Sequence, residues 1–123
     1  MSQEIPIILE YYDLSLLLLK RVALFPRNLR HGLGRSIEFR VETLLSLLIR
    51  AKYSPRAEKD AILRDANIEL EILRFQIRQA VELKGLALRN QQAIIEKLIG
   101  VGQQIGGWRK SLGKVHAEES ENP

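Results

Sequence analysis

The 123-residue sequence predicts an all-α fold, an up-down-up-down antiparallel four-helix bundle. Apolar residues recur every three to four positions over long stretches, as on one face of an α-helix. The sequence has no run of alternating β-branched residues bounded by turns, so no strand is predicted. Proline or glycine interrupts the helical pattern at three places, so short connections join long helices and sequential neighbours run antiparallel.

The first two helices are expected to meet at Phe25-Pro26-Arg27, because the residue before a proline avoids the α region. The first spans about Pro6 to Leu24, and the second about Pro26 to Lys52. The second carries one apolar stripe, formed by Leu29, Leu33, Ile37, Val41, Leu44 and Leu48. Arg40 projects near this stripe, which predicts a Glu or Asp partner on another helix.

Tyr53-Ser54-Pro55 marks the next break, and Ser54 is expected to cap a third helix that begins at Pro55. This helix continues to about Lys84, where Gly85 suits a left-handed stop. A fourth helix spans about Leu88 to Ser111. We expect one domain over residues 1–112 and an acidic, disordered tail over residues 113–123.

The first and third helices carry more apolar surface than one bundle can cover. From Leu14 to Leu24 only three residues are polar, so the first helix is apolar nearly all round. The third has two apolar rows, one of Ile68, Ile72 and Phe75 and one of Leu70, Leu73, Ile77 and Ala80. Large exposed apolar patches are rare on monomers, so this surplus favours self-association over exposed leucines on a single bundle.

The charge distribution favours an anionic partner, nucleic acid first. Lys and Arg number 19 against 15 Asp and Glu, giving a net charge of +4, and three of the acids lie in the last six residues. Between Lys20 and Arg40 there are six basic residues against Glu38 alone. Binding would use the phosphate backbone, since no base-reading motif is present. The candidate binding residues are Lys20, Arg21, Arg27, Arg30, Arg35, Arg74, Arg78, Arg109 and Lys110.

Catalytic, metal and cofactor sites are not expected. The chain has no cysteine and two histidines, His31 and His116, too few ligands for zinc or a di-iron centre. Three residues separate Arg27 from His31, and none separates Arg30 from His31. Neither spacing matches that between the Arg and the His of helical ribonucleases of the HEPN type. The glycines from Gly100 to Gly107 lack both the spacing and the preceding strand of a dinucleotide loop, and are expected to allow close approach or loosen the helix end. Trp108 is expected to be a core or interface anchor rather than a base-stacking residue.

No membrane span or secretion signal is predicted. The longest leucine-rich run, Leu14–Leu19, is far shorter than the roughly 20 apolar residues that a span needs. The first ten residues carry Glu4 and Glu10 and no basic residue, unlike a signal peptide. We therefore expect a cytoplasmic protein.

Four segments together resemble the accessory variability determinant (Avd) family of diversity-generating retroelements. They are Phe25-Pro26-Arg27, Leu33-Gly34, Arg50-Ala51-Lys52-Tyr53-Ser54, and Ile105-Gly106-Gly107-Trp108-Arg109-Lys110-Ser111. The similarity covers roughly Tyr12 to Leu112, and the Phe-Pro-Arg corner combined with the late Gly-Gly-Trp is its most specific part.

The resemblance implies a four-helix bundle that assembles as a homopentameric barrel. It further implies an accessory protein without a catalytic centre, which binds the retroelement's reverse transcriptase and, through a basic surface, template RNA or cDNA during mutagenic retrohoming. Of the matching residues, Phe25, Pro26, Gly106 and Gly107 are interpreted as structural, and Arg27 as a contact to RNA or to the transcriptase.

Three alternatives stay open. The nearest is a four-helix bundle protein encoded within an intervening sequence of a ribosomal RNA gene, with unknown role. The others are a small helical ribonuclease, which His31 would have to serve, and a self-assembling scaffold with no nucleic-acid partner. Gene context separates the first of these from a retroelement protein.

Overall fold

The computed structural model describes the backbone of residues 4–121 and the side chains of residues 6–113. Within this range no strand occurs, and the all-helical fold is confirmed. The elements in chain order are α1 (Glu4–Ala23), α2 (Arg27–Leu29), the π-helical turn η1 (Arg30–Gly34), α3 (Arg35–Tyr53), α4 (Arg56–Glu82) and α5 (Leu88–Glu121). Because α2, η1 and α3 follow one another without a break, they form the second of four long helices.

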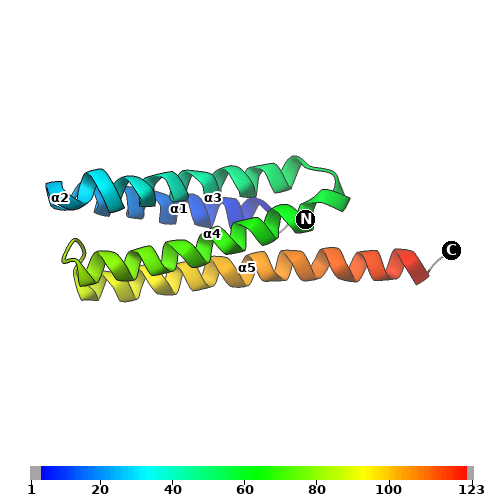
Figure 1. Cartoon of the computed structure of the whole chain (residues 1–123). Coiled ribbons are helices and arrows are strands. Elements are labelled where there is room, and N and C mark those ends of the chain that lie inside the picture. The colour runs from blue at the N-terminus through cyan, green and yellow to red at the C-terminus, as the bar shows by residue number, and fades with distance from the viewer. Residues whose placement is uncertain (1–3, 122–123) are drawn as a thin grey trace.

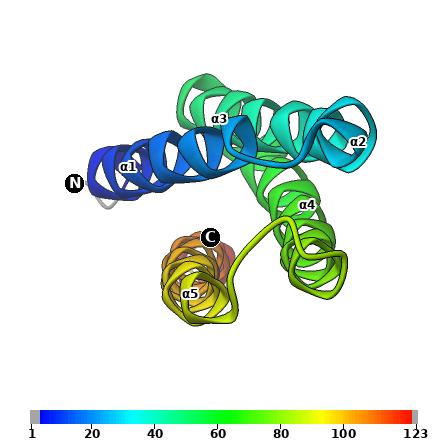
Figure 2. The same ribbon diagram turned by 90° about the vertical axis from the view of Figure 1, so that its left-hand side faces the viewer.

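The four long helices lie side by side in two layers (Figures 1 and 2). Helices α1 and α3 form one layer, and α4 and α5 form the other. Around the bundle, α1 packs against α3 and α5, while α4 packs against α3 and α5. Sequential neighbours run antiparallel, so the α1–α2 corner and the α4–α5 loop lie at one end and the α3–α4 turn lies at the other (Figure 1).

One continuous core runs along the bundle axis. Each long helix contributes a stripe of buried residues three and four positions apart, including Tyr11 and Leu18 of α1, Ile37, Leu44 and Leu48 of α3, Leu63 and Leu73 of α4, and Leu98 and Ile105 of α5. From the predicted stripe of the second helix, Ile37, Val41, Leu44 and Leu48 are buried, whereas Leu29 and Leu33 are partly buried. Burial of such side chains contributes about 1.5–3 kcal/mol each.

Two polar contacts fix the register of α3 against α4. Arg40 donates from Nη1 to Glu69 Oε2 at 2.5 Å, so the acidic partner predicted for Arg40 is confirmed. One turn before Arg40 in α3, Ser36 Oγ accepts a hydrogen bond from Gln76 Nε2 of α4 at 2.7 Å. A sliding of either helix by one turn would leave these half-buried groups without partners, which is costly.

The α3–α4 turn is capped differently from the prediction. Ser54 does not cap α4: its hydroxyl donates back to the carbonyl of Arg50 at 2.6 Å, and Pro55 takes the N-cap position. The exposed carbonyls at the end of α3 are bound by a side chain from α4. Lys59 Nζ donates to the carbonyls of Ala51 and Lys52 at 2.8 and 2.9 Å, a favourable place for a cation at a helix C-terminus.

The left-handed residue of the α4–α5 turn is Lys84, with φ 64°, and Gly85 does not have a positive φ. Gly85 N–H donates to Ala80 O at 2.8 Å and Lys84 N–H to Val81 O at 3.0 Å, the bond pattern of a Schellman motif. Gly85 instead provides space, because a Cβ at this position would lie 2.9 Å from Leu29 Cδ1. The prediction therefore placed the left-handed residue one position too late.

The fourth long helix continues beyond its predicted end at Ser111, since the backbone of α5 is helical to Glu121. It extends past the other helices at its C-terminal end (Figure 1). Residues 122 and 123 lie outside the described range, and the division of the chain at residue 112 stays a prediction.

Replacing the left-handed lysine by glycine is expected to stabilise the bundle. A non-glycine residue in this conformation costs about 1 kcal/mol, which Lys84→Gly removes, less the entropy that glycine adds to the unfolded chain. We expect urea denaturation to show a higher free energy of unfolding for Lys84→Gly. Lys84→Ala removes the same charge but keeps the Cβ, so it serves as the control and should show no such gain.

Tyr11 predicts a specific loss of stability at alkaline pH. Its side chain is fully buried, its hydroxyl donates to the carbonyl of Val41 at 2.7 Å, and burial raises the pKa of Tyr11 well above its usual range. The unfolded chain ionises this phenol near pH ~10 while the folded chain does not, so stability falls as the pH rises above that value. Tyr11→Phe should cost about 1 kcal/mol at pH 7.

The cost of Tyr11→Phe should then shrink between pH 9 and pH 11, in urea titrations of both proteins. A cost of Tyr11→Phe that is constant over this pH range contradicts the prediction.

Candidate nucleic-acid interface

Five basic residues gather where α1 turns into the second long helix. We call this set the cationic corner: Lys20 and Arg21 at the end of α1, Arg27 in α2, Arg30 in η1, and Arg35 at the start of α3. Arg21 is half-buried and the other four are exposed. None of the five forms a salt bridge with another described residue.

The π-helical turn decides where Arg30 points. Arg30 lies seven residues before Ile37, which is fully buried, so an uninterrupted α-helix would place Arg30 on the buried stripe. The wider turn from Arg30 to Gly34 adds one residue, which rotates the preceding part by about 100° relative to α3. Arg30 is consequently exposed, as are Arg27 and Arg35.

Two glycines allow the corner to close. A Cβ on Gly34 would lie 3.1 Å from Val22 Cγ1 and 3.6 Å from Phe25 Cδ2, and one on Gly85 would lie 3.5 Å from Phe25 Cδ1. The ring of Phe25 is buried between these two backbone segments. The structural role expected for Phe25 therefore has a physical basis: its ring joins α1, η1 and the α4–α5 loop.

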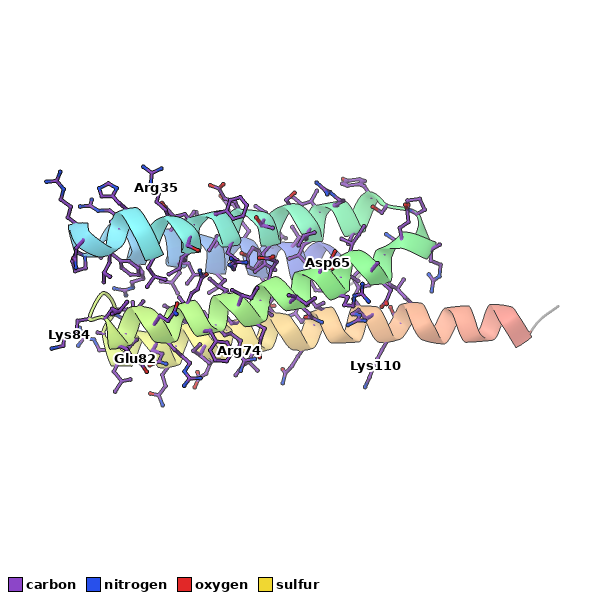
Figure 3. All side chains as sticks on the ribbon, in the orientation of Figure 1. Arg35, Asp65, Arg74, Glu82, Lys84 and Lys110 are labelled. Atoms are coloured by element: carbon purple, nitrogen blue, oxygen red, sulfur yellow. The ribbon has the colours of Figure 1, made fainter. Side chains whose placement is uncertain are left out.

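The structure adds cations that the sequence analysis did not select. The α4–α5 loop lies at the same end of the bundle, and Lys84 projects from it into solvent (Figure 3). Arg89, in the first turn of α5, is also exposed, as is His31 within η1. The antiparallel topology could have revealed Lys84 and Arg89, because it places this loop beside the Pro26 corner.

Three of the four other candidate cations contact groups within the chain. Arg74 Nη1 lies 3.0 Å from Glu71 Oε1, and the guanidinium of Arg78 lies 5.4 Å from the ring centre of Phe75. Arg109 donates from Nε and Nη2 to the two oxygens of Asp60 at 2.9 and 3.4 Å. This hydrogen bond lowers the pKa of the Asp60 carboxyl below its usual value. These contacts distinguish them from the cationic corner.

Arg109 and Lys110 lie toward the opposite end from the cationic corner. Arg56, the first residue of α4, donates to the carbonyl of Leu112 at 3.1 Å, which places this part of α5 beside the α3–α4 turn. Lys110 is exposed, and Figure 3 shows it projecting from the outer side of α5. The structure thus places Lys20, Arg21, Arg27, Arg30 and Arg35 toward one end of the bundle and Arg109 and Lys110 toward the other.

Trp108 belongs to the core. It is 3% exposed, and Lys59 Nζ lies 5.9 Å from its ring centre. The prediction of an anchoring role over base stacking agrees with this burial. In contrast, a Cβ on Gly106 or Gly107 would meet no other atom within 4 Å. Within the described chain, nothing approaches these two glycines closely.

The described side chains contain no group of three or more His, Asp or Glu residues placed to hold a metal ion. Among the described helices, none has a segment both long enough and apolar enough to cross a membrane.

Comparisons with known proteins identify the family. A protein-family model described as bAvd-like matches residues 7–112, which includes the cationic corner and the buried Trp108. No curated protein and no solved structure matches the chain. Since the matched region spans most of the sequence and comprises four long helices, the chain belongs to the bAvd-like family.

Proposed function

We propose that this protein is a non-enzymatic accessory subunit of a diversity-generating retroelement in the cytoplasm. It binds the reverse transcriptase of the element and, through the cationic corner, the phosphate backbone of template RNA or cDNA. In this role it supports mutagenic retrohoming, while the polymerase active site belongs to the transcriptase.

The observation that carries this proposal is the cationic corner itself. Its five cations lie within one turn region of a bAvd-like chain and make no salt bridge to described residues, so their charge is available to a partner. Arginine binds phosphate oxygens bidentately, and phosphate contacts hold a strand without selecting its sequence. Such contacts suit a protein that must accept a template of variable sequence.

Assembly as a homopentamer is part of the same proposal. It is supported by the apolar surplus, since the row Ile68, Ile72 and Phe75 on α4 is 52%, 37% and 53% exposed, whereas the second predicted row is buried. Side chains of this size on one helical face are commonly covered by a partner. An oligomer would also repeat the cationic corner, and repeated weak sites bind a long polyanion much more tightly than one site does.

The bAvd-like match favours the retroelement role over a ribosomal-RNA intervening-sequence protein, a helical ribonuclease or a scaffold without nucleic acid. A neighbouring gene for a reverse transcriptase, with template and variable repeats, would support it. A location inside a ribosomal RNA gene would favour the first alternative instead.

Removing three cations from the corner should weaken nucleic-acid binding. We expect the triple variant Arg27→Ala, Arg30→Ala and Arg35→Ala to bind single-stranded RNA roughly 100-fold more weakly at low salt. The slope of log affinity against log salt should flatten by roughly 2, because each lost phosphate contact removes about 0.7 for a single strand. Fluorescence anisotropy at several salt concentrations measures both quantities.

The matched control removes three exposed cations elsewhere, through Arg50→Ala, Arg64→Ala and Lys97→Ala. It has the same net charge as the corner variant, so a general charge effect would weaken both proteins equally. Equal RNA affinities for the corner variant and wild type would refute the assignment of the corner. The same variants, tested for co-purification with the transcriptase, show whether the corner also contacts that protein.

The mass of the protein in solution tests the assembly. Multi-angle light scattering should give about five times the chain mass of 14.1 kDa. A mass that is another multiple of the chain mass would support self-association but contradict the pentamer. The mass of a single chain would contradict both.

A further inference from the structure

We propose that the outer side of α3 is a binding site for unpaired nucleobases, which stack on the exposed rings of Phe39 and Tyr53. We call this surface the aromatic side of α3. The inference rests on the nucleic-acid binding in the proposed function and adds a second kind of contact to it. The cationic corner holds phosphates, whereas an aromatic ring stacks on a base that is unpaired. The aromatic side of α3 therefore favours single strands over duplexes.

Phe39 and Tyr53 are the two most exposed aromatic side chains among those that the structure describes. They are 66% and 77% exposed, whereas Tyr11, Phe25 and Trp108 are buried in the core. Neither exposed ring is needed to fill the core, so both are accessible to a ligand.

Helical periodicity places both rings on the same side of α3 as Arg35 of the cationic corner. Tyr53 follows Arg35 by 18 residues, which at about 100° per residue is five full turns, and Phe39 follows it by about one turn. Figure 3 shows Arg35 projecting from the outer side of α3, away from the layer of α4 and α5. A line of about 27 Å along this side therefore leads from the cationic corner past Phe39 to Tyr53.

Two open hollows lie along this stretch of α3. One, of about 360 Å³, is lined in part by Phe39, and the other, of about 690 Å³, is lined in part by Ile49 and Tyr53. Glu42 and Arg50 border both hollows, so opposite charges balance there, and the rest of the lining is uncharged. A hollow without net charge suits the flat, neutral face of a base better than it suits a phosphate.

A cation accompanies the ring at each end of the line. Nζ of Lys52 lies 5.0 Å from the ring centre of Tyr53, a cation–π contact that occupies one face of the ring. At the other end, Arg35 lies one turn before Phe39 and forms no salt bridge with a described residue. Phosphates that flank a stacked base can bind these two cations. Between them, the carboxylate of Glu42 repels phosphates and can accept from an amino group of a base, which turns the bases toward the helix.

A single-stranded nucleic acid matches this arrangement better than a protein segment does. It offers a phosphate to the cations and a flat face to the rings and hollows at every nucleotide. At about 3.4 Å per stacked nucleotide, roughly eight nucleotides span the distance of about 27 Å from Arg35 to Tyr53. One strand can thus bind the cationic corner and the aromatic side of α3 at once.

Removing either ring should weaken the binding of single strands only. We expect Tyr53→Ala and Phe39→Ala each to bind an unstructured DNA strand of about 12 nucleotides roughly 5- to 100-fold more weakly, since one stacked base contributes a factor of this size. Fluorescence anisotropy measures this affinity. The affinity for a duplex of the same length and the salt dependence of binding should stay as in wild type, because no charge is lost. Tyr53→Phe keeps the ring and should bind like wild type.

A strand without bases gives the sharpest comparison. A chain of about 12 abasic deoxyribose phosphates has the charge of the DNA strand but nothing to stack. Wild type should bind it about as weakly as the double variant Phe39→Ala with Tyr53→Ala binds the DNA strand. The double variant should bind the abasic chain as wild type does. A loss of affinity that is equal for the two probes would contradict stacking.

The matched control is Tyr12→Ala, which removes a half-exposed aromatic ring from α1 and should leave the affinity for the single strand unchanged. Light scattering of every variant checks that the assembly, and with it the number of cationic corners, stays the same. Far-UV circular dichroism checks the helical content.

The outcomes separate this inference from the proposed function. A wild type that binds neither the strand nor the duplex contradicts both. A wild type whose binding depends on the cationic corner, but whose affinity for the strand survives Phe39→Ala and Tyr53→Ala unchanged, contradicts this inference only. If these variants bind the strand normally but no longer co-purify with the transcriptase, the aromatic side of α3 contacts protein, and this inference is equally overturned.

Discussion

The structure depends on the packing of Phe25 at the end of the bundle. Its ring lies between Gly34 and Gly85, two backbones that approach so closely that a methyl group at either would contact it. This single contact joins α1, the π-helical turn and the α4–α5 loop. The left-handed residue of this loop is Lys84, and Gly85 provides space, since a Cβ there would lie 2.9 Å from Leu29 Cδ1. Lys84 thus carries about 1 kcal/mol of backbone strain at this closely packed end.

The same end carries the cationic corner, whose five cations form no salt bridge with described residues, whereas several cations along the bundle do. Along the bundle, Arg40, Arg74 and Arg109 each have a carboxylate partner, and Lys59 binds the carbonyls that end α3. These cations serve the fold. The arginines of the cationic corner form no salt bridge with described residues. The π-helical turn directs Arg30 away from the core position that its spacing from Ile37 would give it. A π-helical turn costs hydrogen-bond quality, and turns of this kind often mark functional positions.

The sequence predicted the long-range organisation better than the local details. Four helices, their breaks at Pro26, Pro55 and Gly85, and an acidic partner for Arg40 follow from periodicity and burial, which depend on many residues at once. The π-helical turn was not predicted, because the apolar residues in and before it also fit the spacing of an ordinary α-helix. Ser54 was assigned to the wrong helix because its hydroxyl can bond to a preceding carbonyl as well as to a following N–H group. Of the candidate binding residues, charge alone could not separate Arg27 and Arg35 from Arg74 and Arg109. Arg109 pairs with Asp60, which is 49 residues earlier. Arg74 pairs with Glu71 at a spacing of three residues, which Arg35 and Glu38 also have without forming a salt bridge.

The proposed pentamer and the cationic corner reinforce each other through geometry. The exposed apolar row of α4 lies on a side of the bundle, whereas the corner lies at its end. When copies of the chain contact one another side to side around an axis parallel to the bundle, every copy points the same way. All cationic corners would then lie on one rim, at the same end of the assembly. The net charge of +4 is modest for a single chain that binds nucleic acid. Repeated on one rim, the five cations of each corner would form a continuous basic surface, and the phosphate contacts of several copies would add along one strand. A bundle that is only weakly basic as a monomer can in this way become a strong ligand for RNA or cDNA without any additional charge.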